Sequence, residues 1–401
     1  MTPQSAFQAI NNLFEQIDHV SFEVQYWDLK RVKYGSEKPA FTIIFHTPAA
    51  VEDTLKQVSL GFGERYMQGD IDIEGDIQKL TELLFDPKVL RIRPNLKALF
   101  AILLLRLKFR NSIDQSKKNI SFHYDLSNEF YETWLDKRMV YSCAYFKEEG
   151  ISIEQAQEDK LEYICRKLLL QPGQTLLDIG CGWGALVIYA VQKYKVKAHG
   201  VTLSRNQLEK AKARIAEAGL EKDITLELID YRDLVKRGDT FDRVVSVGMM
   251  EHVGKNNIPT YIHSTNKLLK PLGVGLIHTI GKLKSDAIDD WMNEYIFPGA
   301  YLPEPGEIIN GLRDQGLEVY HLENLQRHYA RTLAAWRDRF EANQNKIKEM
   351  VSPEVIRAYR LYLNGCISAF KVGGISLYQI SFCKGQLEQI PIPLTNAHLH
   401  V

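Results

Sequence analysis

Apolar and polar positions change their rhythm along the chain, and the clearest pattern starts at residue 175. Short apolar runs there alternate with stretches in which apolar residues recur every three or four positions, which are the periods of buried strands and amphipathic helices. The predicted strands are Thr175–Gly180, Lys197–Leu203, Ile224–Asp230, Phe241–Gly248 and Gly273–Gly281. The predicted helices among them are Ala185–Tyr194, Asn206–Ala218 and Pro259–Leu269. This alternation indicates an α/β domain built on a parallel, doubly wound sheet with right-handed crossovers.

The parts of the chain on either side follow other patterns. Strand-like pieces near Val20–Tyr26 and Ala40–His46 indicate a smaller α/β N-terminal domain over residues 1–110. We expect a catalytic domain over residues 111–401, in which residues 111–170 form a mainly helical lead-in and part of the active site. The later elements of this domain are predicted strands at Leu317–Asn324 and Ile375–Lys384 and predicted helices at Ala330–Met350 and Glu354–Phe370.

The composition is that of an ordinary globular protein. The 401 residues are 45% hydrophobic and 25% charged, which excludes a disordered chain, a collagen and a disulfide scaffold. Five cysteines without a Cys-x-x-Cys pair and eleven histidines without a His-x-x-x-His spacing predict reduced thiols and no metal site. Because no apolar run reaches about 18 residues and the N-terminus lacks a signal-peptide pattern, we expect a cytoplasmic protein.

Charge changes this picture through its distribution. Lys+Arg 50 balance Asp+Glu 50, which argues against a nucleic-acid partner. Residues 52–76 nevertheless hold seven acidic against two basic residues, a net of −5, and residues 88–118 hold nine basic against one acidic, a net of +8. The apolar octet Ala98–Leu105 lies inside the basic segment. A helix of this kind suits an anionic membrane surface, and it equally suits a buried core or dimer helix.

A glycine turn carries the first chemical signal. The first predicted strand ends in LLDIGCGWG, where Asp178 closes the strand and Gly180, Gly182 and Gly184 form the turn. Glycine permits a positive φ and lets a ligand approach the backbone, and the N–H groups at the start of the next helix point toward that ligand. The spacing is G-x-G-x-G, whereas dinucleotide-binding turns have G-x-G-x-x-G. An aspartate just before such a turn suits S-adenosylmethionine.

The ends of the next two strands refine this interpretation. The second strand ends at Thr202, Leu203 and Ser204 without the acidic residue that holds a nicotinamide-linked ribose, which disfavours a dinucleotide. The third strand ends in an acid beside a flat ring, a combination that suits the amine and face of an adenine. Its residues are Asp230, Tyr231 and Arg232. The alternative for the tyrosine is a surface aromatic near a strand end.

Ten segments together resemble the cyclopropane-fatty-acyl-phospholipid synthase family. They run in order from about Ser121 to the C-terminus: FHYDLSNEFYETWLD, MVYSCAYF, LLDIGCGWGAL, GVTLSRNQ, DYRDL, FDRVVSVGMMEHVG, LIHTIG, YIFPGAYLP, HYARTLAAWRDRF and YLNGCISAF. Upstream, LGFGERYMQGDIDIEGDI is similar to the N-terminal domain of the bacterial phospholipid-modifying members. The resemblance implies a class I S-adenosylmethionine methyltransferase fold with added helical elements that cover the lipid.

The resemblance also implies a reaction and its residues. Members transfer a methylene group from S-adenosylmethionine to a cis double bond of an acyl chain, and a bound bicarbonate removes the proton. The positions that match the bicarbonate pocket are Cys143, Glu251, His278, Ile280 and Tyr329. In such a pocket Glu251 would fix the tautomer of His278 or accept the bicarbonate proton. Positions that match cofactor contacts, besides those of the three strand ends, are Tyr141, Ser142 and Gln207.

Each of these residues also has a structural interpretation. Glu251 follows a strand and is placed to cap a helix, and Tyr329 is placed to pack at a helix start. His278 lies in an apolar strand, where a core histidine is the ordinary interpretation and only the resemblance favours catalysis. Cys366 is a candidate nucleophile in this family, yet it lies on an apolar helical face where no positive group favours a thiolate.

We therefore expect a cytoplasmic enzyme that acts on unsaturated phospholipids at the inner face of the membrane. Its expected partners are the phospholipid acyl chain, an anionic membrane surface bound reversibly, and a second copy in a homodimer, with no nucleic acid. Two alternatives remain open: a related methyltransferase that yields a methyl-branched lipid or a methylated amine, and a lipid-binding protein with an inactive methyltransferase fold.

Overall fold

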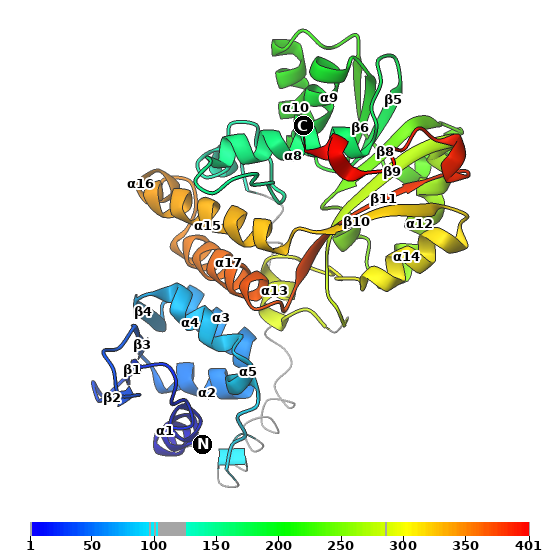
Figure 1. The fold of residues 1–401 in the computed structure, drawn as a ribbon. Helices are drawn as coiled ribbons and strands as arrows, with labels where there is room; N and C mark the ends of the chain where they lie inside the picture. The colour runs from blue at the N-terminus through cyan, green and yellow to red at the C-terminus, as the bar shows by residue number, and fades with distance from the viewer. Residues whose placement is uncertain (1, 96–97, 100–101, 103–125, 285–286, 401) are drawn as a thin grey trace. The chain divides into compact units, whose positions relative to one another are not determined.

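The computed structural model describes residues 2–95, 98–99, 102, 126–284 and 287–400 (Figure 1). The chain divides into two compact units. The first, here called the N-terminal unit, comprises Met1–Leu126, Ile288–Pro298 and Phe340–Gly374. The second, here called the sheet unit, comprises Ser127–Ala287, Gly299–Arg339 and Ile375–Val401. Two segments from the last third of the chain thus join the N-terminal unit, whereas the sequence predicts that domain as one continuous stretch.

The described residues of the N-terminal unit form a four-stranded sheet in the order β2-β1-β3-β4. Its strands are β1 (Phe22–Gln25), β2 (Arg31–Tyr34), β3 (Phe41–Phe45) and β4 (Ile71–Gly75). Strands β1 and β3 are parallel and the other pairs are antiparallel. Alternate residues of β1, Phe22 and Val24, are fully buried, which is the period expected of a strand with one face on a core.

Helices pack against one another within the same unit. They are α1 (Pro3–Phe14), α2 (Pro48–Lys56), α3 (Val58–Gln68), α4 (Ile77–Leu84), α5 (Pro87–Leu90), α13 (Asp290–Tyr295), α16 (Gln344–Ile347) and α17 (Pro353–Lys371). Buried hydroxyls join α17 to α4, since Thr81 Oγ1 lies 2.8 Å from Ser368 Oγ and 3.2 Å from the carbonyl oxygen of Asn364. Because both hydroxyls are buried, these bonds fix the pairing of two helices that lie 287 positions apart.

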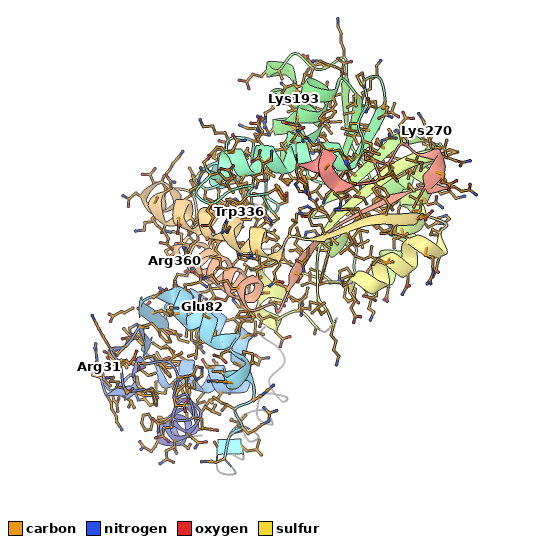
Figure 2. All side chains as sticks on the ribbon, in the orientation of Figure 1. Arg31, Glu82, Lys193, Lys270, Trp336 and Arg360 are labelled. Carbon is orange, nitrogen blue, oxygen red and sulfur yellow. The ribbon has the colours of Figure 1, made fainter. Side chains whose placement is uncertain are left out.

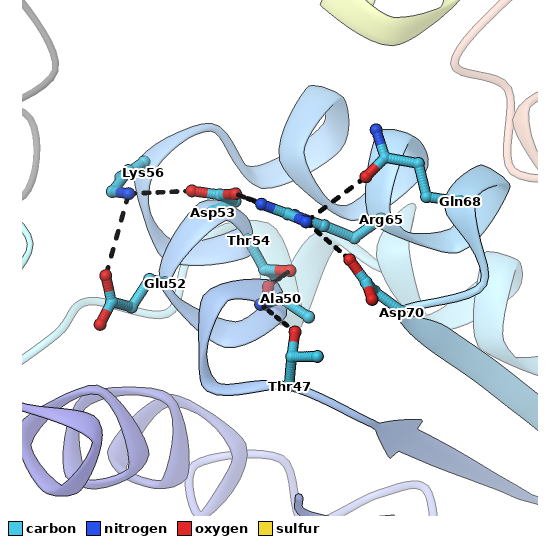
Figure 3. Close-up of polar contacts among 9 residues, drawn as sticks. All are labelled: Thr47, Ala50, Glu52, Asp53, Thr54, Lys56, Arg65, Gln68 and Asp70. Carbon is cyan, nitrogen blue, oxygen red and sulfur yellow. Dashed lines mark hydrogen bonds and ion pairs between the residues drawn. The ribbon is translucent and has the colours of Figure 1, made fainter. Parts of the chain in front are cut away.

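Two basic residues within the acidic segment 52–76 pair with its carboxylates (Figure 3). Arg65 donates to Asp53 and to Asp70, each at 2.6 Å, and Lys56 lies 2.8 Å from the other oxygen of Asp53. Partial burial acts to raise the pKa of Asp53, but the ion pairs with Lys56 and Arg65 lower it below its usual value. Lys56 and Arg65 are the two bases already counted in the net charge of −5, so these pairs leave that excess in place. Most of the basic segment and of Ala98–Leu105 lies outside the described residues.

The described part of the sheet unit contains a seven-stranded sheet in the order β10-β11-β9-β8-β5-β6-β7. The strands are β5 (Thr175–Ile179), β6 (Lys197–Thr202), β7 (Ile224–Leu228), β8 (Phe241–Val247), β9 (Leu269–Gly281), β10 (Glu318–Asn324) and β11 (Ser376–Cys383). The first five run parallel. Strand β11 is antiparallel to β9, and β10 is antiparallel to β11, so β10 runs with the five.

Helices cover both faces of this sheet (Figure 1). The helices of the described part of this unit are α7 (Asn128–Glu132), α8 (Ile153–Lys167), α9 (Ala185–Tyr194), α10 (Arg205–Glu217), α11 (Tyr231–Arg237), α12 (Ile258–Leu268), α14 (Pro305–Asp314) and α15 (Gln326–Ala342), whose last three residues fall in the N-terminal unit. One buried cluster joins α8, α9 and α10 to Leu176, and a second joins α11, α12 and α14 to Leu177. Neighbouring residues of one strand thus face opposite helical layers, which confirms the predicted doubly wound sheet.

Two helical predictions need correction. Within the described residues of the predicted lead-in, α7 and α8 are helical, but residues 133–152 form turns and irregular chain. The helix predicted over Ala330–Met350 begins earlier, at Gln326, and is interrupted after Ala342 before α16. In the part of the chain that the structure describes, no helix has the length and apolar character needed to cross a membrane.

Candidate active site

The glycine turn follows β5 at the carboxyl edge of the sheet. Gly180, Gly182 and Gly184 have φ of +87°, +53° and +80°, where glycine is favoured because it has no Cβ. The N–H groups of Gly180 and Cys181 donate to the carbonyl oxygen of Val201 at 2.9 and 3.0 Å, which ties the turn to β6. Helix α9 begins directly after Gly184, so its first N–H groups open onto the same edge. The predicted ligand turn is therefore formed by the local backbone.

Asp178 and Lys160 lie buried beneath this turn. Burial raises the pKa of Asp178 to about 7, although the charge of Lys160 opposes the rise. Asp178 Oδ1 has no hydrogen-bond partner among the described residues. A buried acceptor of this kind fits the ammonium and hydroxyl donors of S-adenosylmethionine, so the residues present suit that cofactor.

Lys160 is a residue that the sequence analysis missed. It is 2% exposed, and its Nζ donates to Ser142 Oγ at 3.0 Å. Burial lowers the pKa of Lys160 to about 8, against the charge of Asp136. The lysine falls on the apolar face of α8, four positions after Ala156 and four before Ile164, and a cation at such a position was the available signal. Lys160 therefore connects two predicted cofactor residues: it donates a hydrogen bond to Ser142, and its charge acts on Asp178.

The end of β6 is organised by its own side chains. Ser204 caps α10 by accepting from the N–H of Gln207 at 3.3 Å, and Thr202 Oγ1 lies 3.2 Å from Gln207 Oε1. Leu203 is 75% exposed between these two polar residues. An apolar side chain held outward at the carboxyl edge is suited to lie against a ligand's flat face. The four predicted residues are thus brought together, and their role stays a prediction.

The end of β7 shows the structural interpretation alongside the functional one. Asp230 caps α11 by accepting from the N–H of Arg232 at 2.8 Å, and it also binds the Arg232 guanidinium through both oxygens. These hydrogen bonds hold the pKa of Asp230 below its usual range. The ring of Tyr231 meets Tyr261 edge-on, with centroids 5.6 Å apart. The acid and the ring are adjacent, as an adenine site requires, but both already have protein partners.

Glu251 and Ile280 are joined by a hydrogen bond. The N–H of Ile280 in β9 donates to Glu251 Oε1 at 2.6 Å. Glu251 is 5% exposed, and burial raises its pKa to about 7 even though the Ile280 N–H favours the carboxylate. Its second oxygen, Oε2, has no hydrogen-bond partner among the described residues. The structure therefore holds one carboxylate oxygen in place and leaves the other available for a ligand.

His278 lies two residues before Ile280, on the same face of β9. It is 1% exposed, and its Nδ1 lies 3.1 Å from Gln379 Nε2. Its Nε2 has no hydrogen-bond partner among the described residues. Burial, with the charges of Lys160 and Lys167, lowers the pKa of His278 well below its usual value. Glu251 makes no hydrogen bond to His278 among the described residues, and Gln379 contacts Nδ1, so a role of Glu251 in fixing the tautomer stays a prediction.

Cys143 and Tyr329 come to the same region through Leu325. Cys143 Sγ donates to the carbonyl oxygen of Leu325 at 3.9 Å, and the Tyr329 N–H donates to that oxygen at 3.1 Å. The N–H of Leu325 donates to Leu377 in β11, which lies opposite Ile280. Burial raises the pKa of the Cys143 thiol, so it is a neutral packing group. All five predicted pocket residues lie in the sheet unit.

An aromatic cluster surrounds the predicted cofactor residue Tyr141. Its ring contacts three buried rings at centroid distances of 5.3–5.5 Å, those of Tyr131, Trp134 and Trp336 (Figure 2 labels Trp336). Trp183 of the glycine turn contacts Tyr131 and donates to Asn128 Oδ1 at 2.7 Å. These rings exclude water from the region beside the turn. Their grouping was missed because the rings come from four separate segments.

Cys366 belongs to the N-terminal unit, on α17. Burial raises the pKa of its thiol to about 12, and Asp289 adds to the rise. A thiol of this kind is protonated at neutral pH and is a weak nucleophile. The geometry therefore favours the packing interpretation of Cys366.

The strand order of the seven-stranded sheet, its single reversed strand β11 and the glycine turn after β5 define a class I S-adenosylmethionine-dependent methyltransferase. Residues 111–380 match a family model described as mycolic acid cyclopropane synthetase. The chain belongs to this cyclopropane synthase family, which confirms the resemblance and the enzyme class. Residues 9–91 match a model described as a domain of unknown function.

Named relatives agree with this assignment. The chain is 41% identical over 346 residues to the cyclopropane-fatty-acyl-phospholipid synthase of Escherichia coli K12, which covers 84% of this chain and 86% of that one. It is 36% identical to a "probable fatty acid methyltransferase" of Pseudomonas putida, covering 90% and 91%. Among solved structures, the cyclopropane synthase MmaA2 of Mycobacterium tuberculosis has a TM-score of 0.62 at 33% identity, covering 68% of this chain and 100% of that one.

A further solved structure bears on the cofactor. The mycolic acid cyclopropane synthase CmaA1, described as complexed with SAH and CTAB, has a TM-score of 0.62 at 34% identity and covers 66% of this chain and 97% of that one. SAH is the demethylated product of S-adenosylmethionine. That complex agrees with the cofactor class inferred from the glycine turn and Asp178.

Proposed function

We propose that this enzyme transfers a methylene group from S-adenosylmethionine to a cis double bond in the acyl chain of a phospholipid, forming a cyclopropane ring. The observation that carries the proposal is two buried atoms without a hydrogen-bond partner among the described residues. They are Oε2 of Glu251, whose other oxygen accepts from Ile280 of β9, and Nε2 of His278 in β9. They lie in the same unit as the cofactor turn. Ring closure requires a base, and these two unpartnered atoms offer a carboxylate oxygen and a ring nitrogen to hold one.

The chemistry sets out what the protein must do. When bound, S-adenosylmethionine would supply a sulfonium methyl group, which leaves the sulfur as S-adenosylhomocysteine forms and bonds to one alkene carbon; loss of a proton from that methyl group closes the ring onto the other carbon. The chain must align the alkene and keep water from the positive charge that develops on it. The rings around Tyr141 provide an apolar wall that supplies no strong nucleophile to that charge.

The residues present fit bicarbonate as the base. When bound, bicarbonate would supply the oxygen that takes the proton. Its hydroxyl would donate to Glu251 Oε2, and one of its other oxygens would accept from the N–H at His278 Nε2. The hydrogen bond from the Ile280 N–H fixes the orientation of the Glu251 carboxyl group. A pKa of about 7 keeps a large fraction of Glu251 ionised at neutral pH. Tyr329 and the backbone near Cys143 complete the proposed pocket.

The test incubates the protein with S-adenosylmethionine and vesicles of unsaturated phospholipid, with and without added bicarbonate. We expect loss of the acyl double bond at a rate that rises with bicarbonate and falls about a hundredfold or more in Glu251→Gln. The matched control is Glu209→Gln, because Glu209 is an exposed glutamate of α10. Product that retains the double bond contradicts the proposal, and a methyl-branched or N-methylated product supports the alternative methyltransferases.

We also propose that the enzyme binds reversibly to an anionic membrane surface at the inner face of the membrane and acts as a homodimer. The support for membrane binding is the net charge of +8 over residues 88–118, which contain the apolar octet. Co-sedimentation with anionic vesicles in rising salt tests the membrane part, which fails if pelleting ignores both salt and lipid charge. Sedimentation equilibrium tests the dimer, which fails if the mass stays at 46.0 kDa.

A further inference from the structure

Gln379 lies directly opposite His278 in the pairing of β11 with β9. Both side chains are buried, with Gln379 at 0% and His278 at 1% exposure. Lys167, the last residue of α8, reaches the same place with a side chain that is 1% exposed. Its Nζ donates to Gln379 Oε1 at 2.7 Å and to Glu323 Oε2 at 2.6 Å. Three residues that no sequence motif connects thus form a chain of contacts that ends at the imidazole.

The chemistry of the lysine fixes the direction of every bond in this chain. An ammonium group donates hydrogen bonds and cannot accept them, so the Gln379 atom that faces Lys167 must be the amide oxygen. The amide NH₂ of Gln379 therefore faces His278, and Gln379 Nε2 lies 3.1 Å from His278 Nδ1. An NH₂ group donates, so Nδ1 must accept. In a neutral imidazole the single proton is then on Nε2.

The surroundings keep the imidazole neutral and the lysine charged. Burial and the positive charges of Lys160 and Lys167 hold the pKa of His278 well below its usual value. Burial lowers the pKa of Lys167 to about 8, and the adjacent Glu323 carboxylate limits that fall. Lys167 is therefore mostly an ammonium at neutral pH, which is the state that the bond directions require.

We propose that Lys167 and Gln379 are positioning residues that hold His278 in its Nε2–H tautomer, so that His278 presents a hydrogen-bond donor and not an acceptor to the anion. The role in catalysis rests on the proposed function, because it assumes a bound anion at Nε2. The tautomer itself depends only on the protein. The buried Nε2 has no partner among the described residues, as expected for a donor kept for a ligand.

The test reads the tautomer by NMR of the full-length protein labelled with ¹⁵N-histidine, using long-range ¹⁵N–¹H correlations. The His278 signals are identified by their loss in His278→Gln. We expect the wild-type protein to show the proton on Nε2 and an unprotonated Nδ1 near neutral pH. In Lys167→Met the amide of Gln379 is free to turn its oxygen toward Nδ1, so we expect a population with the proton on Nδ1. In Gln379→Met we expect a mixture of both tautomers.

Kinetics separates positioning from general destabilisation. We expect kcat to fall about tenfold to hundredfold in each variant, the usual range for removing an outer partner of a functional group, with KM for S-adenosylmethionine within about twofold. The double variant should lose no more than the worse single variant, since both act through one imidazole. The matched control is Ser381→Ala, which removes a buried hydroxyl two positions further along β11 and leaves the tautomer and kcat unchanged.

Two results overturn the inference. One is a wild-type His278 with its proton on Nδ1, which needs no variant and so does not depend on how well a variant folds. The other is an unchanged tautomer in both folded variants. Because the tautomer is measured without substrate, an enzyme that forms no cyclopropane but shows Nε2–H would contradict the proposed function and leave the protein-level inference standing.

Discussion

Replacing Glu251 by glutamine should make the protein more stable above neutral pH while it lowers activity about a hundredfold or more. Burial raises the pKa of Glu251 from its usual 4.5 to about 7. At about 1.4 kcal/mol for each pH unit, this interval corresponds to about 3 kcal/mol of folding free energy. This is the free energy by which the ionised, buried carboxylate of Glu251 destabilises the folded protein above neutral pH. Glutamine retains the oxygen that accepts from Ile280 and carries no charge.

The sign follows from proton binding. Because the folded-state pKa of Glu251 lies above the unfolded value, the folded protein binds this proton more tightly, and the contribution of Glu251 to stability is lost as pH rises from 4.5 to 7. Relative to the wild type, Glu251→Gln should therefore gain stability through this window and keep a constant advantage of about 3 kcal/mol above it. Asp178, whose pKa burial also raises to about 7, contributes equally to both proteins and cancels.

Urea unfolding followed by tryptophan fluorescence, at pH 5, 6, 7 and 8, measures this difference. We expect the free energies of unfolding to lie within about 1 kcal/mol of each other at pH 5 and to separate as pH rises. Glu209→Gln, on the exposed face of α10, is the matched control for the loss of one carboxylate. A pH-independent difference for Glu251→Gln would mean that burial does not raise the pKa of Glu251, which would refute this prediction.

Three further predictions concern Lys160, the glycine turn and Cys366. Lys160→Met removes the donor to Ser142, and we expect the Kd for S-adenosylmethionine to rise about tenfold in calorimetry; an unchanged Kd refutes this role. Gly184→Ala and Gly238→Ala each place a side chain at a φ near +80° and should each lose about 1 kcal/mol of stability, but only the first should weaken cofactor binding. Cys366→Ala should keep kcat within about twofold, because a thiol with a pKa near 12 is no nucleophile at neutral pH; a loss of tenfold or more restores its catalytic role.

Much of the sheet unit could be predicted from the sequence, because buried parallel strands are continuous apolar runs. The strand predicted at Thr175–Gly180 is observed as β5, which ends one residue earlier, and the predicted helix Ala185–Tyr194 is α9 without change. The glycine turn could also be predicted, because all its residues lie within one short stretch of the sequence. Residues 133–152 were assigned to helix wrongly, because their apolar side chains build an irregular buried segment that has no helical period.

Interactions between distant positions could not be predicted. Lys167 and Gln379 lie 212 positions apart, and only the pairing of β11 with β9 brings the amide onto His278. Helix α17 was predicted from its period, but its place in the N-terminal unit depends on the bond between Ser368 and Thr81. Lys160 left a trace in the sequence, a cation on an apolar face, and buried lysines are rare enough that it should have been noted.

The most direct measurement of the central claim uses S-adenosylmethionine with a fully deuterated methyl group and a phospholipid that carries one cis double bond. Mass spectrometry of the product acyl chain counts the deuterium that remains. We expect an acyl chain without a double bond that keeps two of the three deuterium atoms, since one leaves with the base as the ring closes. A product that keeps all three, or that still contains the double bond, would contradict cyclopropane formation.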